Sequence, residues 1–216
     1  MVNGGITNDG RCLRTCRARP SMTVHTSRTL PRASALPHER IIQRHKMKTT
    51  HSIRAARPDD AARIAVLGAH VWVHTYAAAG VSEVIAQYVT AKFTPENILA
   101  LLNDPGIVLL VAEANANLAG YIVMRFGSHH ADVPTEIETL YIQDSFAGCG
   151  IGSALLTHAR GVAMARTGNR AVWLIVNSQN EKAISFYRAR GMTQDGIAYF
   201  ELGGIKHENK VMVARD

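Results

Sequence analysis

The chain has 216 residues, of which 47% are hydrophobic, and this is enough for one folded domain with a sizeable core plus extensions. Because the sequence contains no apolar run long enough to span a bilayer, we expect a soluble, cytoplasmic protein without a membrane partner. The net charge of +7 comes from the first fifty residues, where ten Lys and Arg stand against two Asp and Glu, whereas residues 51–216 carry fourteen against fifteen. The folded part is therefore close to neutral, which removes the main reason to expect a nucleic-acid partner.

Residues 1 to about 50 form a basic leader rich in Arg, Ser, Thr and Pro, without strand or helix periodicity. Three interpretations stay open: a disordered tail, an organelle transit peptide, or an extension from an upstream start codon, with Met47 as the alternative start. Cys12 and Cys16 lie in this leader and lack a second ligand pair, so they predict neither a disulfide framework nor a metal site. We therefore divide the chain into a leader, 1–50, and a single domain, 51–216.

The first part of the domain is predicted to contain one strand and two or three helices. His51–Ala55 is typical of a strand, and Pro58 followed by two aspartates is typical of the first turn of a helix. A second helical segment is expected from Val81 to Phe93, and a third is expected to begin at Thr94. The turn signal Asn103-Asp104-Pro105-Gly106 then ends this helical region.

The middle of the chain is predicted to form three strands. Ile107–Ala114 and Leu118–Phe126 are separated by Asn115-Ala116-Asn117, which is typical of a hairpin. A loop is expected over Gly127–Pro134, and the third strand ends at Ile142.

Three glycines at alternate positions follow that strand, at 148, 150 and 152. The segment then becomes apolar at helical spacing, through Ile151, Leu155, Ala159 and Val162. A glycine turn that opens a helix exposes unpaired backbone N–H groups at the positive helix end, and the missing side chains let a ligand approach them. The pattern predicts a site for phosphate oxygens, with a flexible helix start that binds nothing as the alternative interpretation.

The last third of the chain is predicted to contain a strand, a helix and a closing hairpin. Ala171–Val176 is a short apolar run rich in β-branched residues, as in a buried strand. The following segment begins with capping side chains and ends at Gly191, a helix C-cap signal. Met192–Leu202 and Lys206–Ala214 are expected to form the hairpin, joined by two glycines.

The strand, the glycine turn and the later segment Asn180-x-x-Ala183-x-x-Phe186-Tyr187-x-x-x-Gly191-Met192 together resemble the GNAT superfamily of acetyl-CoA-dependent N-acetyltransferases. The resemblance covers about residues 52–216, and its specific motifs lie between Leu140 and Met192. It implies an α/β fold with a mixed, mostly antiparallel central sheet flanked by helices. The strands that end at Ile142 and Val176 would splay apart to hold acetyl-CoA.

The resemblance also implies how acetyl-CoA is held. The pantetheine arm would pair with the strand backbone at Leu140, Tyr141 and Ile142, as an added strand would. The pyrophosphate would contact the turn and helix start, formed by Ala147, Gly148, Cys149, Gly150, Ile151, Gly152 and Ser153. Ala147 stands where the family usually has Gln or Arg, and Cys149 where a basic residue is common, so the backbone would receive less help from side chains.

Attack of an amine on a thioester needs a base for the ammonium proton, donors for the oxyanion and an acid for the departing thiolate. The resemblance assigns Tyr187 as the general acid, with a core tyrosine beside Phe186 as the alternative. Asn180 is predicted either to contact the cofactor or simply to cap a helix. Glu136 and Glu138 lie two apart on one strand face, and we choose Glu138 as the general base, with Glu136 or water as alternatives.

Several other polar and aromatic residues are candidates for binding. His70 and His74 are spaced to hold a metal, but no third ligand is evident and the family needs none, so we expect no metal. Trp72 and Tyr76 lie on another face of the same helix and are expected to pack or to line the acceptor pocket. In the family, the hairpin that carries His207-Glu208-Asn209 overhangs the acceptor cleft, so these residues are candidate substrate contacts or ordinary exposed hairpin residues.

The sequence thus predicts direct transfer of an acetyl group from acetyl-CoA to a primary amine, without a covalent enzyme intermediate. The acceptor stays open among a small amine, an amino acid, an antibiotic and a peptide or protein N-terminus, and so does the oligomeric state, including a homodimer. The alternative function is a non-catalytic acyl-CoA-binding regulatory module that keeps the phosphate site but has lost turnover.

Overall fold

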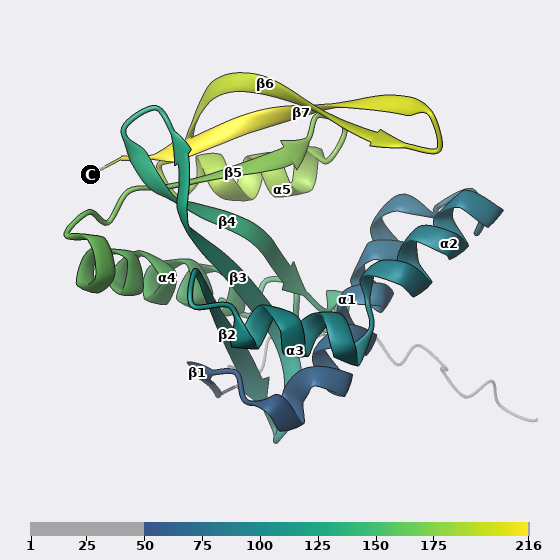
Figure 1. Ribbon diagram of the computed structural model, residues 1–216, viewed down its shortest axis with the longest axis horizontal. Coiled ribbons are helices and arrows are strands. Elements are labelled where there is room, and N and C mark those ends of the chain that lie inside the picture. The colour runs from purple at the N-terminus through teal and green to yellow at the C-terminus, as the bar shows by residue number, and fades with distance from the viewer. Residues whose placement is uncertain (1–49, 216) are drawn as a thin grey trace, which may run out of the picture. The chain divides into compact units, whose positions relative to one another are not determined.

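The computed structural model describes residues 50–215, which form one seven-stranded sheet with helices on both faces (Figure 1). The strand order is β1-β2-β3-β4-β5-β7-β6, and all neighbours are antiparallel except β4 and β5. The strands are β1 (His51–Ala55), β2 (Ile107–Ala114), β3 (Asn117–His130), β4 (Val133–Ile142), β5 (Val172–Asn177), β6 (Thr193–Leu202) and β7 (Ile205–Ala214). This architecture confirms the predicted fold class. Apart from Thr50, the predicted leader over residues 1–50, with Cys12, Cys16 and Met47, lies outside the described residues.

Three helices precede the second strand. They are α1 (Ala61–Tyr76), which follows the 3-10 turn η1 (Pro58–Asp60), α2 (Glu83–Lys92) and α3 (Pro95–Asn103). Ser82 and Thr94 cap α2 and α3, since their hydroxyl oxygens accept hydrogen bonds from the third helical N–H at 3.3 and 3.2 Å. The predicted second and third helices are therefore present, each starting directly after a capping side chain.

The core lies on both faces of the central strands. Ile122 and Met124 of β3 pack into one hydrophobic cluster with α4 (Ile151–Thr167) and α5 (Glu181–Arg188), whereas Tyr121 and Val123 pack into a second cluster with α1 and α3. Because both faces are covered, β2 and the part of β3 at 118–124 are nearly continuous apolar runs and do not alternate between apolar and polar residues. Between the two helical layers, the sheet opens at the ends of β4 and β5.

Two predicted hairpins are present with the backbone geometry that tight turns need. Asn115 and Ala116 have φ of 51° and 63°, and they join β2 directly to β3. Gly203 and Gly204 have φ of 58° and 78° between β6 and β7. Both pairs are in the left-handed region, which asparagine and glycine adopt at low cost.

The prediction of a loop over Gly127–Pro134 is wrong. β3 runs to His130 and β4 begins at Val133, so most of this segment forms a hairpin. Its polar composition is typical of a loop, but contacts from distant elements hold it in the sheet: the Trp173 indole N–H donates to the carbonyl of Ser128 at 2.9 Å. A register shift between Phe126 and His130 absorbs the positive φ of Gly127 as a bulge.

Candidate active site

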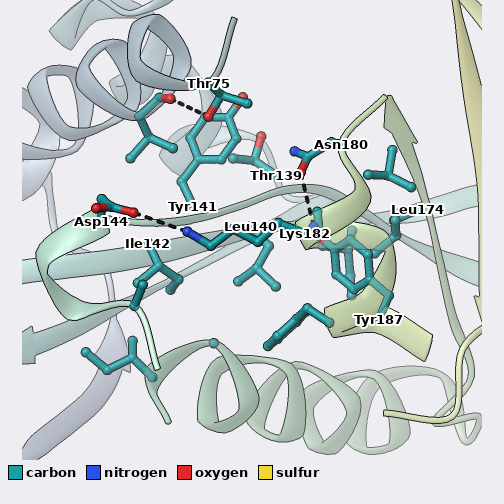
Figure 2. A pocket seen from close by; sticks show the side chains of 18 of the residues that line it. Thr75, Thr139, Leu140, Tyr141, Ile142, Asp144, Leu174, Asn180, Lys182 and Tyr187 are labelled. Carbon is teal, nitrogen blue, oxygen red and sulfur yellow. Dashed lines mark hydrogen bonds and ion pairs between the residues drawn. The ribbon is translucent and has the colours of Figure 1, made fainter. Parts of the chain in front are cut away.

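Strands β4 and β5 separate after a single paired position. Glu136 lies opposite Trp173, and no further pair joins the two strands among the described residues. A cavity of about 610 Å³ lies beyond that point and is lined by residues 140–142 of β4 and 174–176 of β5. Figure 2 shows Leu140, Tyr141 and Ile142 on one strand and Leu174 on the other. The splayed strand pair predicted from the sequence is therefore present.

A β-bulge in β4 lies where the strands separate. The partners of Val123 and Met124 on β3 are Thr139 and Ile137, so Glu138 is the extra residue. A bulge changes the direction of the side chains around it, and such bulges are often found beside functional sites. Glu138 and Thr139 both line the cavity as a result.

The glycine turn and the start of α4 form one end of this cavity. Gly148 and Gly150 have φ of 78° and 85°, which requires glycine at these positions. Ala154 is the first residue of α4 whose N–H donates to a backbone carbonyl, that of Gly150 at 3.0 Å. The N–H groups at 151–153 precede this bond, so they are the unpaired donors of a helix start. All the predicted turn residues from Ala147 to Ser153 line the cavity except Cys149.

Cys149 lies apart from its neighbours in the turn. Its N–H donates to the carbonyl of Phe146 at 3.2 Å, and its side chain packs against the core. The structure therefore does not place Cys149 with the other predicted cofactor-binding residues.

Arg190 is a cationic lining residue that the sequence reasoning missed. Its Nε donates to the Ser153 hydroxyl oxygen at 2.9 Å and its Nη1 donates to the Phe186 carbonyl at 2.9 Å, while the guanidinium lies 3.7 Å from the centre of the Phe186 ring. The contact with Ser153 brings a positive charge to the first turn of α4. No local pattern marks this role, because Arg190 lies in the turn that follows α5, which ends at Arg188.

Helix α5 brings two predicted residues to the cavity. The Asn180 side chain accepts a hydrogen bond from the Ala183 N–H at 3.1 Å, so it caps α5, and it also interacts with the Tyr76 hydroxyl. Tyr187 lines the same cavity with 7% of its surface exposed (Figure 2). Burial raises the pKa of Tyr187 well above its ordinary value, and the nearby Tyr76 hydroxyl raises it further. The phenol is therefore protonated at neutral pH.

A second cavity of about 960 Å³ adjoins the first. The two have eight lining residues in common: Thr75, Tyr76, Glu138, Thr139, Tyr141, Ile175, Asn180 and Lys182. The second cavity extends from this common wall toward α2 and the β6–β7 hairpin. A molecule in one cavity can thus meet a molecule in the other at the bulge of β4.

Glu138 lies in this common wall and is held by cations. The Arg125 guanidinium donates to Oε2 at 2.9 Å, and the Lys92 ammonium lies 3.6 Å from Oε1. Glu136 lines neither cavity and accepts a hydrogen bond from the Ser128 hydroxyl at 2.7 Å. Of the two carboxylates predicted as bases, the structure therefore brings only Glu138 to the site.

The comparisons with known proteins identify the family. The model of the acetyltransferase (GNAT) family matches residues 71–192, which include the bulge, the glycine turn and α5. The chain belongs to the GNAT acetyltransferase family. It is 30% identical over 157 residues to an uncharacterized N-acetyltransferase of Mycobacterium tuberculosis, which covers 73% of this chain and 97% of that relative.

Other relatives of this GNAT acetyltransferase are more distant. A spermidine N(1)-acetyltransferase of Thermoplasma acidophilum is 27% identical over 143 residues, covering 64% of this chain and 86% of that protein. The crystal structure of PaiA N-acetyltransferase from the same organism, in complex with coenzyme A, superposes with a TM-score of 0.63 at 22% identity, covering 77% of this chain and 99% of that one. The latter similarity establishes the shared fold.

As a GNAT acetyltransferase, the protein is an acyltransferase whose co-substrate is acetyl-CoA. The residues present fit this donor. One edge of β4 is open along the cavity, which suits the amide groups of a pantetheine arm. The start of α4 offers unpaired N–H groups and the charge of Arg190 to phosphate oxygens.

The remaining candidate residues of the GNAT domain fall into three groups. The His70 and His74 rings stack at 6.3 Å and line the first cavity, and residues 50–215 contain no cluster of three potential metal ligands. Trp72 and Tyr76 both line the second cavity, and their rings also pack against each other. In the closing hairpin, His207 and Asn209 also line the second cavity, whereas Glu208 does not and accepts a hydrogen bond from the Ser178 hydroxyl.

Over the described part of the chain, every helix is too short or too polar to cross a membrane.

Proposed function

We propose that this GNAT acetyltransferase transfers the acetyl group of acetyl-CoA directly to a primary amine. The observation that carries this proposal is the pair of adjoining cavities. The first cavity fits the donor, and the second cavity shares a wall with it where an acceptor can bind. Acetyl-CoA supplies an electrophilic thioester carbonyl and a thiolate leaving group. A C–N bond would form and the C–S bond would break at the common wall. Cys149 lies outside the lining of both cavities, which favours direct transfer over a covalent enzyme intermediate.

Donor binding would depend on backbone groups and one side chain. Residues 140–142 would pair with the pantetheine arm, and the amides of Gly148, Gly150 and 151–153 would bind the pyrophosphate. Arg190 would supply the positive charge that Ala147 and Cys149 do not. Asn180 would add a contact from the start of α5 while it caps that helix.

Tyr187 would act as the general acid. A phenol must be protonated to donate to the departing thiolate, and burial ensures this by raising the pKa of Tyr187. Tyr187 lines the first cavity, which fits acetyl-CoA, and does not line the second cavity. This location supports a role toward the leaving group.

Glu138 would receive the proton of the attacking ammonium, directly or through water. Arg125 fixes Oε2, whereas Lys92 lies at the longer distance of 3.6 Å from Oε1, so Oε1 is the better placed of the two oxygens to take a proton. The location of Glu138 in the common wall supports this choice over Glu136.

The proposal is tested by following thiol release from acetyl-CoA with a panel of primary amines. Tyr187→Phe and Glu138→Gln should each lower kcat by about 10²–10⁴-fold, the usual contribution of a positioned acid or base. Tyr199→Phe is the matched control, because Tyr199 is 66% exposed and lies outside both cavities. Binding of acetyl-CoA without thiol release for any amine would support a regulatory module instead.

We further propose that residues 51–216 are the single catalytic domain and that it acts in the cytoplasm. The family match over residues 71–192 and the single sheet formed by β1–β7 support the first point. Deletion of residues 1–46 should leave kcat/KM unchanged and should remove any salt-dependent affinity for nucleic acid. Nucleic-acid affinity that survives the deletion would contradict the assignment of the positive charge to the leader.

A further inference from the structure

Four aromatic side chains form a continuous wall in the second cavity. The ring centres of Trp72 and Tyr76 on α1 are 4.9 Å apart, and Tyr88 on α2 lies 4.8 Å from Trp72. Phe200 on β6 meets Tyr88 edge-on at 5.8 Å. All four line the cavity, and they come from two consecutive helices and from a strand near the end of the chain. An aromatic wall of this kind contributes little to the binding of a polar ligand, but another ring can stack on it.

Two large apolar residues lie at the border of the cavity, among polar lining residues such as Gln179 and His207. Val84 of α2 and Ile205 of β7 are 40% and 63% exposed, although both are large hydrophobic residues. The tip of the β6–β7 hairpin lies against α2, because a Cβ built on Gly203 would be 2.8 Å from Val84 Cγ1. Exposed apolar side chains that border a cavity are typical of a binding site for an apolar ligand.

The charges in this cavity are mostly compensated. Its two acidic lining residues are Glu138 and Glu181, and the Glu138 carboxylate is already paired with Arg125 and Lys92. Lys182 is paired with Asp144 at 3.2 Å (Figure 2). A polyamine carries two or more ammonium groups and would need several carboxylates that are not already paired. The cavity therefore favours a ligand with one amine.

We infer that the acceptor is a monoamine whose amino group is attached to an aromatic body, an arylalkylamine in chemical terms. The inference rests on the proposed acetyl transfer and specifies its acceptor. The ring of the acceptor would stack among Tyr88 and Phe200, and its amine would reach the common wall at Glu138 and Asn180. The aromatic faces would also attract the ammonium before it loses its proton.

The test measures both binding and turnover on the full chain. Binding of 2-phenylethylamine, n-butylamine and spermidine is titrated calorimetrically in the presence of CoA, and thiol release from acetyl-CoA is followed for the same amines. Phe200→Ala removes one ring of the wall, Phe200→Leu keeps an apolar side chain there, and Tyr199→Ala is the control on the adjacent, more exposed residue. Both positions lie at the surface of β6, so we expect the variants to fold.

The aromatic amine should bind about tenfold tighter than the other two. Phe200→Ala should weaken it about three- to tenfold, the range of one aromatic pair, while Phe200→Leu weakens it less and Tyr199→Ala leaves it unchanged. Tighter binding of spermidine, or equal effects of the Phe200 and Tyr199 variants, would overturn the inference and leave the acetyl transfer standing. Retained aromatic selectivity in binding, with thiol release for none of the amines, would instead overturn the proposed transfer.

Discussion

Arg190 offers the most direct test of how this GNAT acetyltransferase binds its donor, because one cationic side chain stands at a helix start that is otherwise neutral. Replacing Arg190 with Met removes the charge and keeps an unbranched apolar chain against the Phe186 ring. The guanidinium uses Nε and Nη2 for the Ser153 hydroxyl and Nη1 for the Phe186 carbonyl, so three of its N–H groups are engaged within the protein. An arginine has five N–H groups, so some of its donors are left for a phosphate.

The expected loss follows from the strength of such contacts. A hydrogen bond to a charged group contributes about 1.5–3 kcal/mol, which corresponds to a Kd for CoA that is about 10- to 150-fold higher in Arg190→Met. Arg190→Lys should recover part of this loss, because it restores the charge without the planar fork. The loss should shrink as salt is added, since Arg190 is only partly buried.

Isothermal titration calorimetry with CoA and with pantetheine separates a phosphate contact from a structural effect. Pantetheine has no phosphate, so its affinity should be the same in Arg190→Met and the wild type. Arg188→Met is the control variant, because Arg188 is the exposed last residue of α5, two positions before Arg190, and lines neither cavity. If Arg190→Met binds CoA within twofold of Arg188→Met, or loses pantetheine affinity equally, Arg190 does not bind the phosphates.

Three further predictions concern the pH profile and the fold. Because the pKa of Tyr187 is raised above 10.0, its acid form persists and kcat of the wild type should not fall between pH 8 and pH 10, measured by thiol release. Asp60→Asn should lower the free energy of unfolding in urea by about 3–5 kcal/mol, because the buried Asp60 carboxylate is held by Arg54 at 2.7 Å and by Arg63. Gly120→Ala should cost about 1–3 kcal/mol in the same assay, since a Cβ there would lie 2.7 Å from the Tyr141 carbonyl oxygen.

Each of these has an outcome that contradicts it. A decline of kcat with a midpoint below pH 10 that is absent in Tyr187→Phe would show that the phenol loses its proton in that range. The pKa of Asp60 is lowered below its ordinary 3.8, so its stabilisation is complete well above that pH and is lost as the pH falls below it. A stability gap between the wild type and Asp60→Asn that stays constant from pH 7 to pH 2 would refute this. Gly161→Ala, at a helical glycine with open space around it, should be neutral or stabilising, and an equal loss there would remove the steric explanation for Gly120.

Much of the secondary structure could be predicted because its signals are local. β1 and β2 have the predicted bounds, and Asn115 and the glycines before α4 occupy the left-handed region that their residue types favour. Ala116 also has a positive φ, which the two-residue turn between β2 and β3 imposes on it. The prediction failed over 127–134, where polar residues are held in a hairpin by a contact with Trp173, far along the chain. No window of neighbouring residues contains that contact.

The surroundings of the candidate base could not be predicted for a similar reason. The spacing of Glu136 and Glu138 placed both on one strand face, with Glu138 as the chosen base and Glu136 or water as the alternatives. A bulge in β4 together with Arg125 and Lys92 distinguishes the two carboxylates. These cations come from α2 and β3, so only the folded chain brings them to one carboxylate.

By itself, the sequence determined the family motifs, the order of the elements and the glycine turn that opens α4, because each depends on backbone preferences of adjacent residues. Only the tertiary structure decided which side chains surround the reacting groups: Arg190 beside Ser153, the cations on Glu138 and the aromatic wall from α1, α2 and β6. These are contacts between side chains of different elements, and they exist only once the sheet and its two helical layers have packed.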